Sequence, residues 1–193
     1  FLKKINSTLI CNIAASSVDE YVECTKILDS EESIKAFEIN VSCPNVKEGG
    51  LEFGNNPQMV GTITSKVRAT TKKTIIIKLS PNVSRISDFA RIVKEEGGDA
   101  VSAINTLVGT SIDINTRKPK LYNIVGGLSG PAIKPVALAK VLEIKRNVDI
   151  PIIALSGHAM VEQKKLDRAG FTDLISKPVK KIDLINGINR WIG

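Results

Sequence analysis

Residues 74–82 read TIIIKLSPN, a β-branched run that ends in a lysine and then in polar residues. Short apolar runs without strict alternation are typical of strands that are buried on both faces of a parallel sheet. This run predicts a strand over Thr74–Ser80. Five further runs of the same kind predict strands over Thr8–Ala14, Ala36–Ser42, Ala100–Thr106, Pro151–Ser156 and Asp173–Ser176.

Longer amphipathic stretches lie between these runs. They predict helices over Val18–Asp29, Pro57–Thr70, Ile86–Glu96, Ile133–Asn147, Met160–Ala169 and Lys180–Trp191. Regular alternation of strand and helix favours an α/β fold with a parallel sheet and right-handed crossovers. We count about six βα units, and the 193 residues suit a single α/β domain.

The composition narrows the classes of partner. The net charge is +7, but aromatic residues are only 4%, so platforms for stacking bases are scarce and nucleic acid is not an expected partner. The longest apolar runs, Ile75–Ile77 and Pro151–Leu155, are too short to cross a bilayer, so no membrane partner is expected. The three cysteines show no metal-ligand spacing, and without a signal-peptide pattern they favour a reducing, cytoplasmic location with no metal site.

One connection interrupts the alternation of strand and helix. About 26 residues separate Thr106 from Ile133, and a segment of that length inside a compact domain is usually functional. Within it, Ile112–Ile124 has a turn signal near Asn115–Lys118 and predicts a hairpin over one end of the sheet. The alternative is an insertion with no role, because loops tolerate insertions.

Polar residues follow the predicted strands at their carboxyl ends, where active residues of parallel α/β folds gather. The ends carry Asn12, Asn40 with Cys43, Lys78, and Asn105 with Thr106. Taken singly, a cysteine there is more often a small buried hydrophobe and an asparagine a turn residue. Lys78 ends an Ile-Ile-Ile run, and because an unpaired buried lysine is costly, an electron-rich partner explains it better. Together the residues indicate a planar, hydrogen-bonding ligand beside a thiol.

Several long motifs, in order, resemble class 1B dihydroorotate dehydrogenases over about residues 1–153. They are NVSCPNVKEGG at 40–50, IKLSPNV at 77–83, INTL at 104–107 and GGLSGPAIKP at 126–135. The resemblance implies a (βα)8 barrel that carries FMN and oxidises dihydroorotate to orotate in pyrimidine biosynthesis. The implied small-molecule partner is therefore orotate or dihydroorotate.

The same resemblance implies roles for individual residues. Cys43 would be the catalytic base that removes a proton from the dihydropyrimidine ring, a task that suits a thiol of tunable pKa. Substrate binding is implied for Asn40, Asn45, Asn105 and Thr106. Lys78 would stabilise negative charge on the reduced flavin. The other implied cofactor-binding residues are Asn12, Asn40, Ile104 and Gly130.

The last quarter of the chain resembles a different family. Residues 154–160, ALSGHAM, and 169–178, AGFTDLISKP, are similar to the last two βα units of a response-regulator receiver domain, which has a flavodoxin-like fold. The receiver's phosphoacceptor aspartate belongs to earlier strands without a counterpart here, which argues against phosphotransfer. Ser156, Gly157, Ser176 and Lys177 form a predicted anion site at two strand ends. The alternative for Lys177 is a solvated lysine before a Pro-started helix, and His158 is interpreted as a loop residue.

These resemblances lead to the hypothesis of an engineered or recombined chimera, joined near Pro151–Leu155, with a dehydrogenase-like part at 1–153 and a receiver-like part at 154–193. Six strands are too few to close an eight-stranded barrel, so we expect an open, doubly wound sheet. Its last helix, Lys180–Trp191, would cover the former barrel interior, and if it does not, the exposed face favours a homodimer. With part of the FMN site missing, the chain is expected to be inactive. The alternative is a flavin- or anion-binding protein with weak dihydroorotate dehydrogenase activity.

Overall fold

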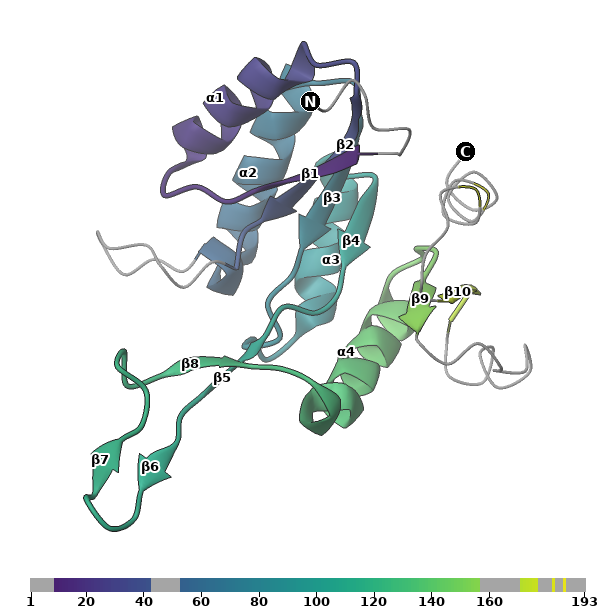
Figure 1. The fold of residues 1–193 in the computed structure, drawn as a ribbon. Coiled ribbons are helices and arrows are strands. Elements are labelled where there is room, and N and C mark those ends of the chain that lie inside the picture. Colours follow the sequence, from purple (N-terminus) through teal and green to yellow (C-terminus); the bar gives the residue numbers. More distant parts are fainter. Residues whose placement is uncertain (1–8, 43–52, 157–170, 177–181, 183–185, 187–193) are drawn as a thin grey trace.

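The computed structural model describes residues 9–42, 53–156, 171–176, 182 and 186, drawn in colour in Figure 1. Its main feature is a four-stranded parallel sheet in the order β1-β2-β3-β4. The strands are β1 (Leu9–Ile13), β2 (Ile34–Asn40), β3 (Thr74–Lys78) and β4 (Ala100–Ser102). All four predicted strands of this part are confirmed, although β4 ends four residues before the predicted Thr106.

Helices follow these strands in the predicted places. They are α1 (Val18–Asp29), α2 (Pro57–Thr70), α3 (Ile86–Glu95) and α4 (Lys134–Asn147), the last preceded by the short 3-10 helix η3 (Pro131–Ile133). Ser17 caps α1 by accepting a hydrogen bond from the Glu20 amide, and Asn56 caps α2 through the amides of Gln58 and Met59. Such caps satisfy backbone donors that have no partner inside the helix, which explains why both helices begin where the sequence predicts.

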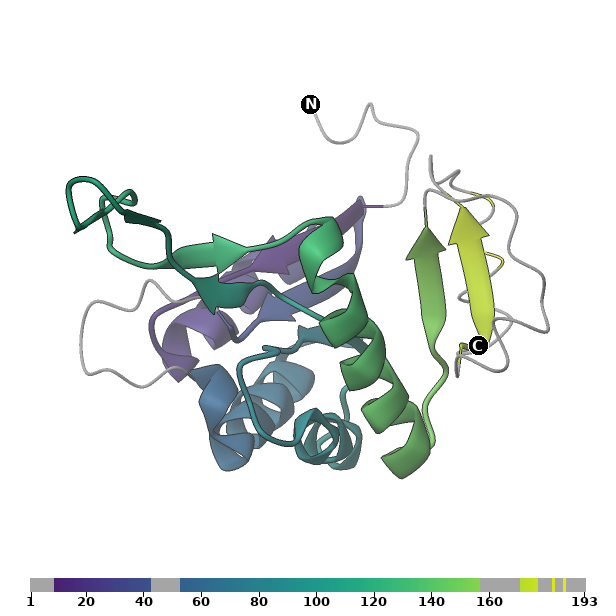
Figure 2. The same cartoon turned by 90° about the horizontal axis from the view of Figure 1, so that it is seen from below.

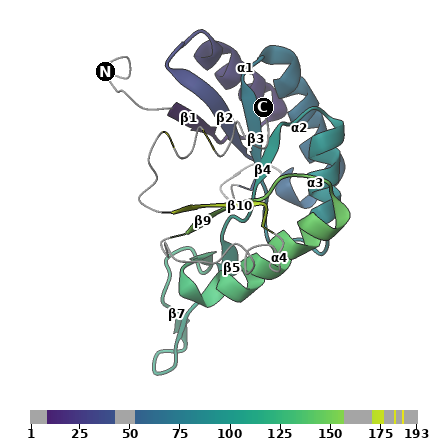
Figure 3. The same cartoon turned by 90° about the vertical axis from the view of Figure 1, so that its right-hand side faces the viewer.

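The helices lie on one face of the sheet. Each packs against the next, α1 against α2, α2 against α3 and α3 against α4, so that they follow the outside of the curved sheet in Figure 3. The side chains between the two layers are apolar and buried. The largest of them are Tyr21, Phe37, Ile39, Ile63, Ile75, Ile77, Leu79, Ile86 and Ile144. This layer is the hydrophobic core of the described residues.

The long connection forms an arm that projects from the sheet (Figures 1 and 2). Its base is the antiparallel pair β5 (Leu107–Gly109) and β8 (Gly126–Leu128), and its tip is the hairpin of β6 (Ile112–Asp113) and β7 (Lys118–Pro119). The predicted hairpin is confirmed. The arm also exposes large apolar side chains, among them Ile114 and Tyr122.

The last two described strands, β9 (Ile153–Ser156) and β10 (Asp173–Ser176), pair in parallel with each other. The prediction of one sheet of about six strands is wrong for the described residues, because β9 and β10 form a sheet separate from β1–β4. β4 is only three residues long, and the chain then leaves into the arm, so β4 offers β9 little edge to pair with. The final predicted helix lies largely outside the described residues, and the doubly wound arrangement stays a prediction.

Candidate functional site

The polar side chains of the sheet gather on the face that the helices do not cover. Side chains alternate between faces along a strand, so Glu38 and Asn40 of β2 lie opposite to the buried Phe37 and Ile39. The registers place Asn12 beside Glu38, Asn40 beside Lys78, and Lys78 beside Ser102. The four strands therefore bring polar residues together at the carboxyl end of the sheet, as the positions of these residues at the strand ends predicted.

Glu38 is the centre of the first cluster. Asn12 Nδ2 donates a hydrogen bond to Glu38 Oε2 at 2.5 Å, and Ser102 Oγ donates to Glu38 Oε1 at 2.7 Å. Lys78 Nζ lies 4.0 Å from Glu38 Oε2, with the Lys78 side chain 31% exposed and that of Glu38 23% exposed. One carboxylate thus joins residues from the other three strands of the sheet.

Asn105 is the centre of the second cluster. Its Nδ2 donates to Ser42 Oγ at 2.6 Å and lies 3.2 Å from Asn40 Oδ1. Ser42 Oγ in turn donates to Asn40 Oδ1 at 3.0 Å and lies 3.5 Å from the Lys78 carbonyl oxygen, which connects this cluster to the first. Tyr21, a buried residue of α1, donates to the Asn40 carbonyl at 2.8 Å and fixes the end of β2 from the helix-covered side.

The segment that carries Asn105 and Thr106 is anchored by backbone and amide hydrogen bonds. The Asn105 amide donates to the Leu79 carbonyl at 3.0 Å, and Asn82 Nδ2 donates to the Thr106 carbonyl at 3.1 Å. A Cβ at Gly127 would lie 2.6 Å from Thr106 Oγ1, so the absence of a side chain at Gly127 lets the arm approach Thr106. The base of the arm therefore holds these two predicted substrate-binding residues at the sheet edge.

The remaining predicted site residues are placed less completely. Ile104 lies between β4 and the arm and packs against the core. Gly130 precedes η3 with φ +85°, a conformation that favours glycine, and it is exposed. No described contact joins Gly130 to the two clusters. Cys43 and Asn45 lie outside the described residues.

The predicted anion site is only partly described. Ser156 ends β9 and Ser176 ends β10, and these two residues are paired in register. The predicted strands are therefore neighbours whose carboxyl ends coincide. Gly157 and Lys177, which follow them, lie outside the described residues, so the anion site stays a prediction.

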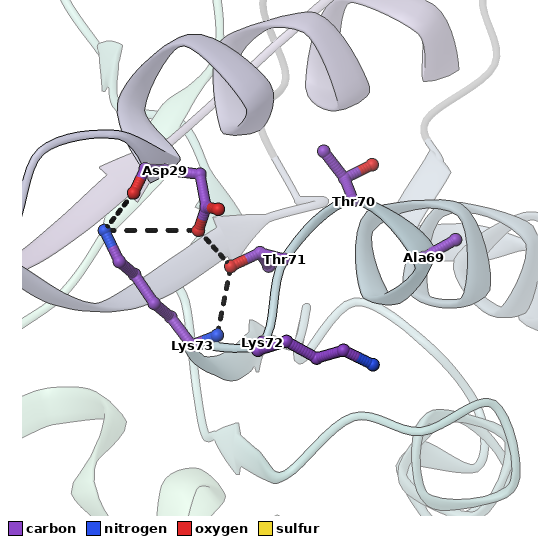
Figure 4. A pocket seen from close by; sticks show the side chains of 6 residues that line it. All are labelled: Asp29, Ala69, Thr70, Thr71, Lys72 and Lys73. Atoms are coloured by element: carbon purple, nitrogen blue, oxygen red, sulfur yellow. Dashed lines mark hydrogen bonds and ion pairs between the residues drawn. The ribbon is translucent and has the colours of Figure 1, made fainter.

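A hollow of about 360 Å³ lies elsewhere, near the ends of α1 and α2 (Figure 4). Lys73 Nζ donates to the Asp29 carbonyl at 2.6 Å, and Thr71 Oγ1 donates to the Asp29 carboxylate. These groups tie α1 to the start of β3. Parallel α/β folds place their chemistry at the carboxyl ends of the strands, whereas this hollow lies at the amino end of β3. We therefore interpret it as a feature that contributes stability.

Sequence reasoning missed four residues that build the site: Glu38, Ser42, Asn82 and Ser102. The signal for two of them was present. Alternation along the predicted strand Ala36–Ser42 would place Glu38 and Ser42 on the same face as Asn40, and a glutamate within an apolar strand requires polar partners. Ser102 carries no such signal, because a serine is common in any strand or loop.

The chain has clear relatives. A model of the family described as dihydroorotate dehydrogenase matches residues 2–163. The chain belongs to the dihydroorotate dehydrogenase family. Among its relatives, the catalytic subunit of dihydroorotate dehydrogenase B (NAD(+)) from Exiguobacterium sibiricum is 46% identical over 157 residues, which are 81% of this chain and 51% of the relative. The proteins of the same description from Trichlorobacter lovleyi and Pelobacter propionicus are each 46% identical, over 199 and 200 residues.

These matches also bear on how much of the family the chain contains. It spans about half to two thirds of the length of these relatives, 51% in the first and 66% in the other two. The last two align with the whole chain, residues 154–193 included, and the family match runs past residue 153. The comparisons thus give no separate support to the receiver-like segment, and the chimera stays a prediction.

The described residues fit the ring of a flavin, the cofactor that the family resemblance implies. The pyrimidine edge of an isoalloxazine ring presents carbonyl acceptors and an N–H donor. Lys78 Nζ donates no hydrogen bond to any described residue, and its side chain is partly exposed, so it has donors for such an edge. The amides of Asn40 and Asn105 add both donors and acceptors beside it.

None of the helices in the described part of the chain has the length and apolar character needed to span a membrane.

Proposed function

We propose that this chain carries the ring-binding part of a flavin-dependent, dihydroorotate-oxidising site. The observation that supports this most strongly is the linked pair of clusters around Glu38 and Asn105. They bring a lysine and two asparagine amides together at the carboxyl end of a parallel sheet, the amides through hydrogen bonds and the lysine through an ion pair with Glu38. Membership of the dihydroorotate dehydrogenase family supports the same assignment.

The roles follow from the chemistry of each side chain. FMN, when bound, supplies the two-electron acceptor that the oxidation of dihydroorotate requires. Lys78 offers a positive charge to the electron-rich end of the ring. Asn105 and Asn40, held by Ser42, offer planar amides to the edge of a pyrimidine, and Thr106 adds a hydroxyl.

Five further residues, predicted from the sequence, complete the proposal. Asn12 and Ile104 line the flavin side, and Cys43 takes the proton from the dihydropyrimidine ring. Asn45 joins the substrate amides and Gly130 the flavin site. The Cys43 thiol must be deprotonated to act as a base, which partial exposure beside cationic or donor groups favours.

The test is whether the two ligands share one site on the 193-residue chain. FMN is titrated into the protein, and orotate is then added while the visible spectrum of the flavin is followed. We expect FMN to be retained and orotate to perturb its spectrum, whereas inorganic phosphate at the same ionic strength leaves the spectrum unchanged. Failure to retain FMN would refute the proposed function.

Turnover is a separate matter from binding. The sequence predicts no meaningful oxidation of dihydroorotate by this chain, because part of the FMN site is expected to be missing and the flavin would then be held imprecisely. A displacement of about 1 Å between the reacting groups can already cost about 100-fold in rate. Anaerobic bleaching of bound FMN by dihydroorotate measures it directly. Bleaching by the wild-type chain that disappears in Cys43→Ala would contradict this prediction and would show that the chain is an active enzyme.

A second candidate function concerns the paired ends of β9 and β10. The register of Ser156 with Ser176 brings two strand ends together, and this favours the predicted binding of a phosphoryl anion by Ser156, Gly157, Ser176 and Lys177. We expect phosphate to shift the amide resonances of Ser156–Ala159 and Lys177–Lys180 in an NMR titration. Stationary resonances in those segments would remove this candidate.

A further inference from the structure

Glu38 occupies an unusual position for a carboxylate. It lies in the middle of β2, between the buried Phe37 and Ile39, and its side chain is 23% exposed. Burying a carboxylate is costly unless hydrogen bonds and an opposite charge compensate it. Here the compensation comes from Asn12 on β1, Ser102 on β4 and Lys78 on β3. A strand that only needed to pack would carry an apolar residue at this place.

We propose that Glu38 is a positioning residue that holds the Lys78 ammonium at the carboxyl end of the sheet, ready for an electron-rich ligand. The inference rests on the proposed function for the identity of that ligand, a flavin ring. It gives Glu38 a role in ligand binding, beyond that of joining the strands.

The geometry around Lys78 supports this role. A lysine side chain has four rotatable bonds and loses much of its conformational entropy when its end is fixed. Lys78 Nζ and Glu38 Oε2 are 4.0 Å apart, which is an ion-pair distance but too long for a hydrogen bond. The carboxylate therefore restrains the ammonium by charge, and because no described residue accepts a hydrogen bond from it, its three N–H donors can turn to a ligand.

The other two contacts explain why the carboxylate itself stays in place. Asn12 and Ser102 donate to its two different oxygens, at 2.5 and 2.7 Å. Hydrogen bonds to an ionised acceptor are stronger than those between neutral groups. With each oxygen held from a different side, the negative charge is fixed beside β3, and Lys78 has one favoured direction in which to extend.

A purely structural role makes a different prediction. If Glu38 only joined strands, its replacement would weaken folding and would affect every ligand equally, whether or not Lys78 is present. If it acts through Lys78, its effect on ligand binding must depend on that lysine. A double-mutant cycle separates the two cases.

The cycle uses the full chain, FMN and the variants Glu38→Gln, Lys78→Ala and their combination. Glutamine keeps the shape of the side chain and removes its charge, and Glu95→Gln, at an exposed position of α3, is the matched control. We expect Glu38→Gln to raise the dissociation constant of FMN about tenfold, the effect of losing one charge-assisted contact. In the Lys78→Ala background, the same change should alter the constant by less than about twofold. Equal losses in both backgrounds, or unchanged or tighter binding in Glu38→Gln, would overturn the inference.

A second readout needs no flavin. The protein is treated with a limiting amount of an N-hydroxysuccinimide ester, and the acylation of each lysine is followed by mass spectrometry, with the exposed Lys72 as the internal reference. Release of Lys78 from Glu38 should make its acylation in Glu38→Gln several-fold faster relative to Lys72. An unchanged ratio would refute the positioning role even if the wild-type chain binds FMN. An altered ratio in a chain that binds no FMN would refute the proposed function and leave the positioning role standing.

Discussion

The two faces of the parallel sheet differ completely, although the same strands build both. On β2 and β3, Ile39 and Ile77 are 0% exposed beneath the helices, whereas their neighbours Glu38 and Lys78 face the other way and keep 23% and 31% of their side chains exposed. One face therefore contributes stability and the other carries the candidate chemistry. Because strand side chains alternate, a change at one residue tests one face and a change at the next residue tests the other.

The largest expected effect is on the helix-covered face. Ile77→Ala removes a fully buried aliphatic side chain and should lower the free energy of unfolding by about 2–5 kcal/mol. Its neighbour Ile76 is only partly buried on the opposite face, so Ile76→Ala should cost clearly less. Urea denaturation of both variants checks the comparison. Equal losses would mean that the two faces are not as different as the structure shows.

The next effect is on the polar face and concerns binding. Asn105→Ala removes the amide that joins Ser42 and Asn40, and it should weaken orotate binding about tenfold or more, as expected for loss of a partly buried hydrogen-bonding group. Isothermal titration calorimetry measures the change. Asn123→Ala, at an exposed position in the arm, is the matched control and should leave orotate affinity at the wild-type value. Affinity that survives Asn105→Ala would remove this residue from the site.

A smaller effect is expected in β9, outside the four-stranded sheet. The sequence predicts a strand over Pro151–Ser156 that is buried on both faces, and in such a strand Ile153→Ala would cost about 2–5 kcal/mol. Ile153 is only partly buried in the structure, so we now expect a loss of about 1 kcal/mol. Thermal and urea unfolding of this variant, compared with Ile77→Ala, test whether β9 is less central than β3. A loss as large as that of Ile77→Ala would contradict the structure.

The smallest effect is a local pH dependence at the tip of the arm. The backbone amides of Thr116 and Asn115 donate to Asp113 Oδ1, at 3.0 and 2.9 Å, and these bonds lower the pKa of the Asp113 carboxyl below its ordinary value of 3.8. A lowered pKa in the folded state means that the turn is favoured above the ordinary pKa and is lost as the pH falls through the lower, folded value. In an acid titration, the Thr116 and Asn115 amide resonances should move with a midpoint below 3.8. A midpoint at or above that value would show that the turn does not hold the carboxylate.

Much of the fold followed from patterns that act locally. The bounds of α1 and α2 were predicted to the residue, because Ser17 and Asn56 cap them and the apolar spacing continues to their ends. The course of the chain after β4 could not be predicted in the same way. An apolar run continues through Ile104, but the chain turns out of the sheet after Ser102, and the arm that causes this is specified by long-range contacts such as the one between Asn82 and Thr106.

Several residues of the two clusters were among those singled out from the sequence, but the contacts that join them were not predicted. Asn12, Asn40, Lys78 and Asn105 could be found because a polar residue at the end of an apolar strand is conspicuous. The hydrogen bonds from Ser42 and to Glu38 were not predicted, because they depend on the register between neighbouring strands, which the sequence of one strand does not contain. The same limit applies to the separation of β9 from β4.

The most direct test of the whole account compares two lysines at opposite ends of the sheet. Lys78 lies at the carboxyl end of β3, and the exposed Lys72 lies just before its amino end, beside the hollow near α1 and α2. The FMN dissociation constant of the wild-type chain is measured by quenching of flavin fluorescence, together with those of Lys78→Ala and Lys72→Ala. The account predicts that Lys78→Ala weakens binding by about tenfold or more and that Lys72→Ala has no effect beyond the loss of one exposed charge. Equal behaviour of the two variants, or a larger loss in Lys72→Ala, would contradict the assignment of the carboxyl edge as the flavin site.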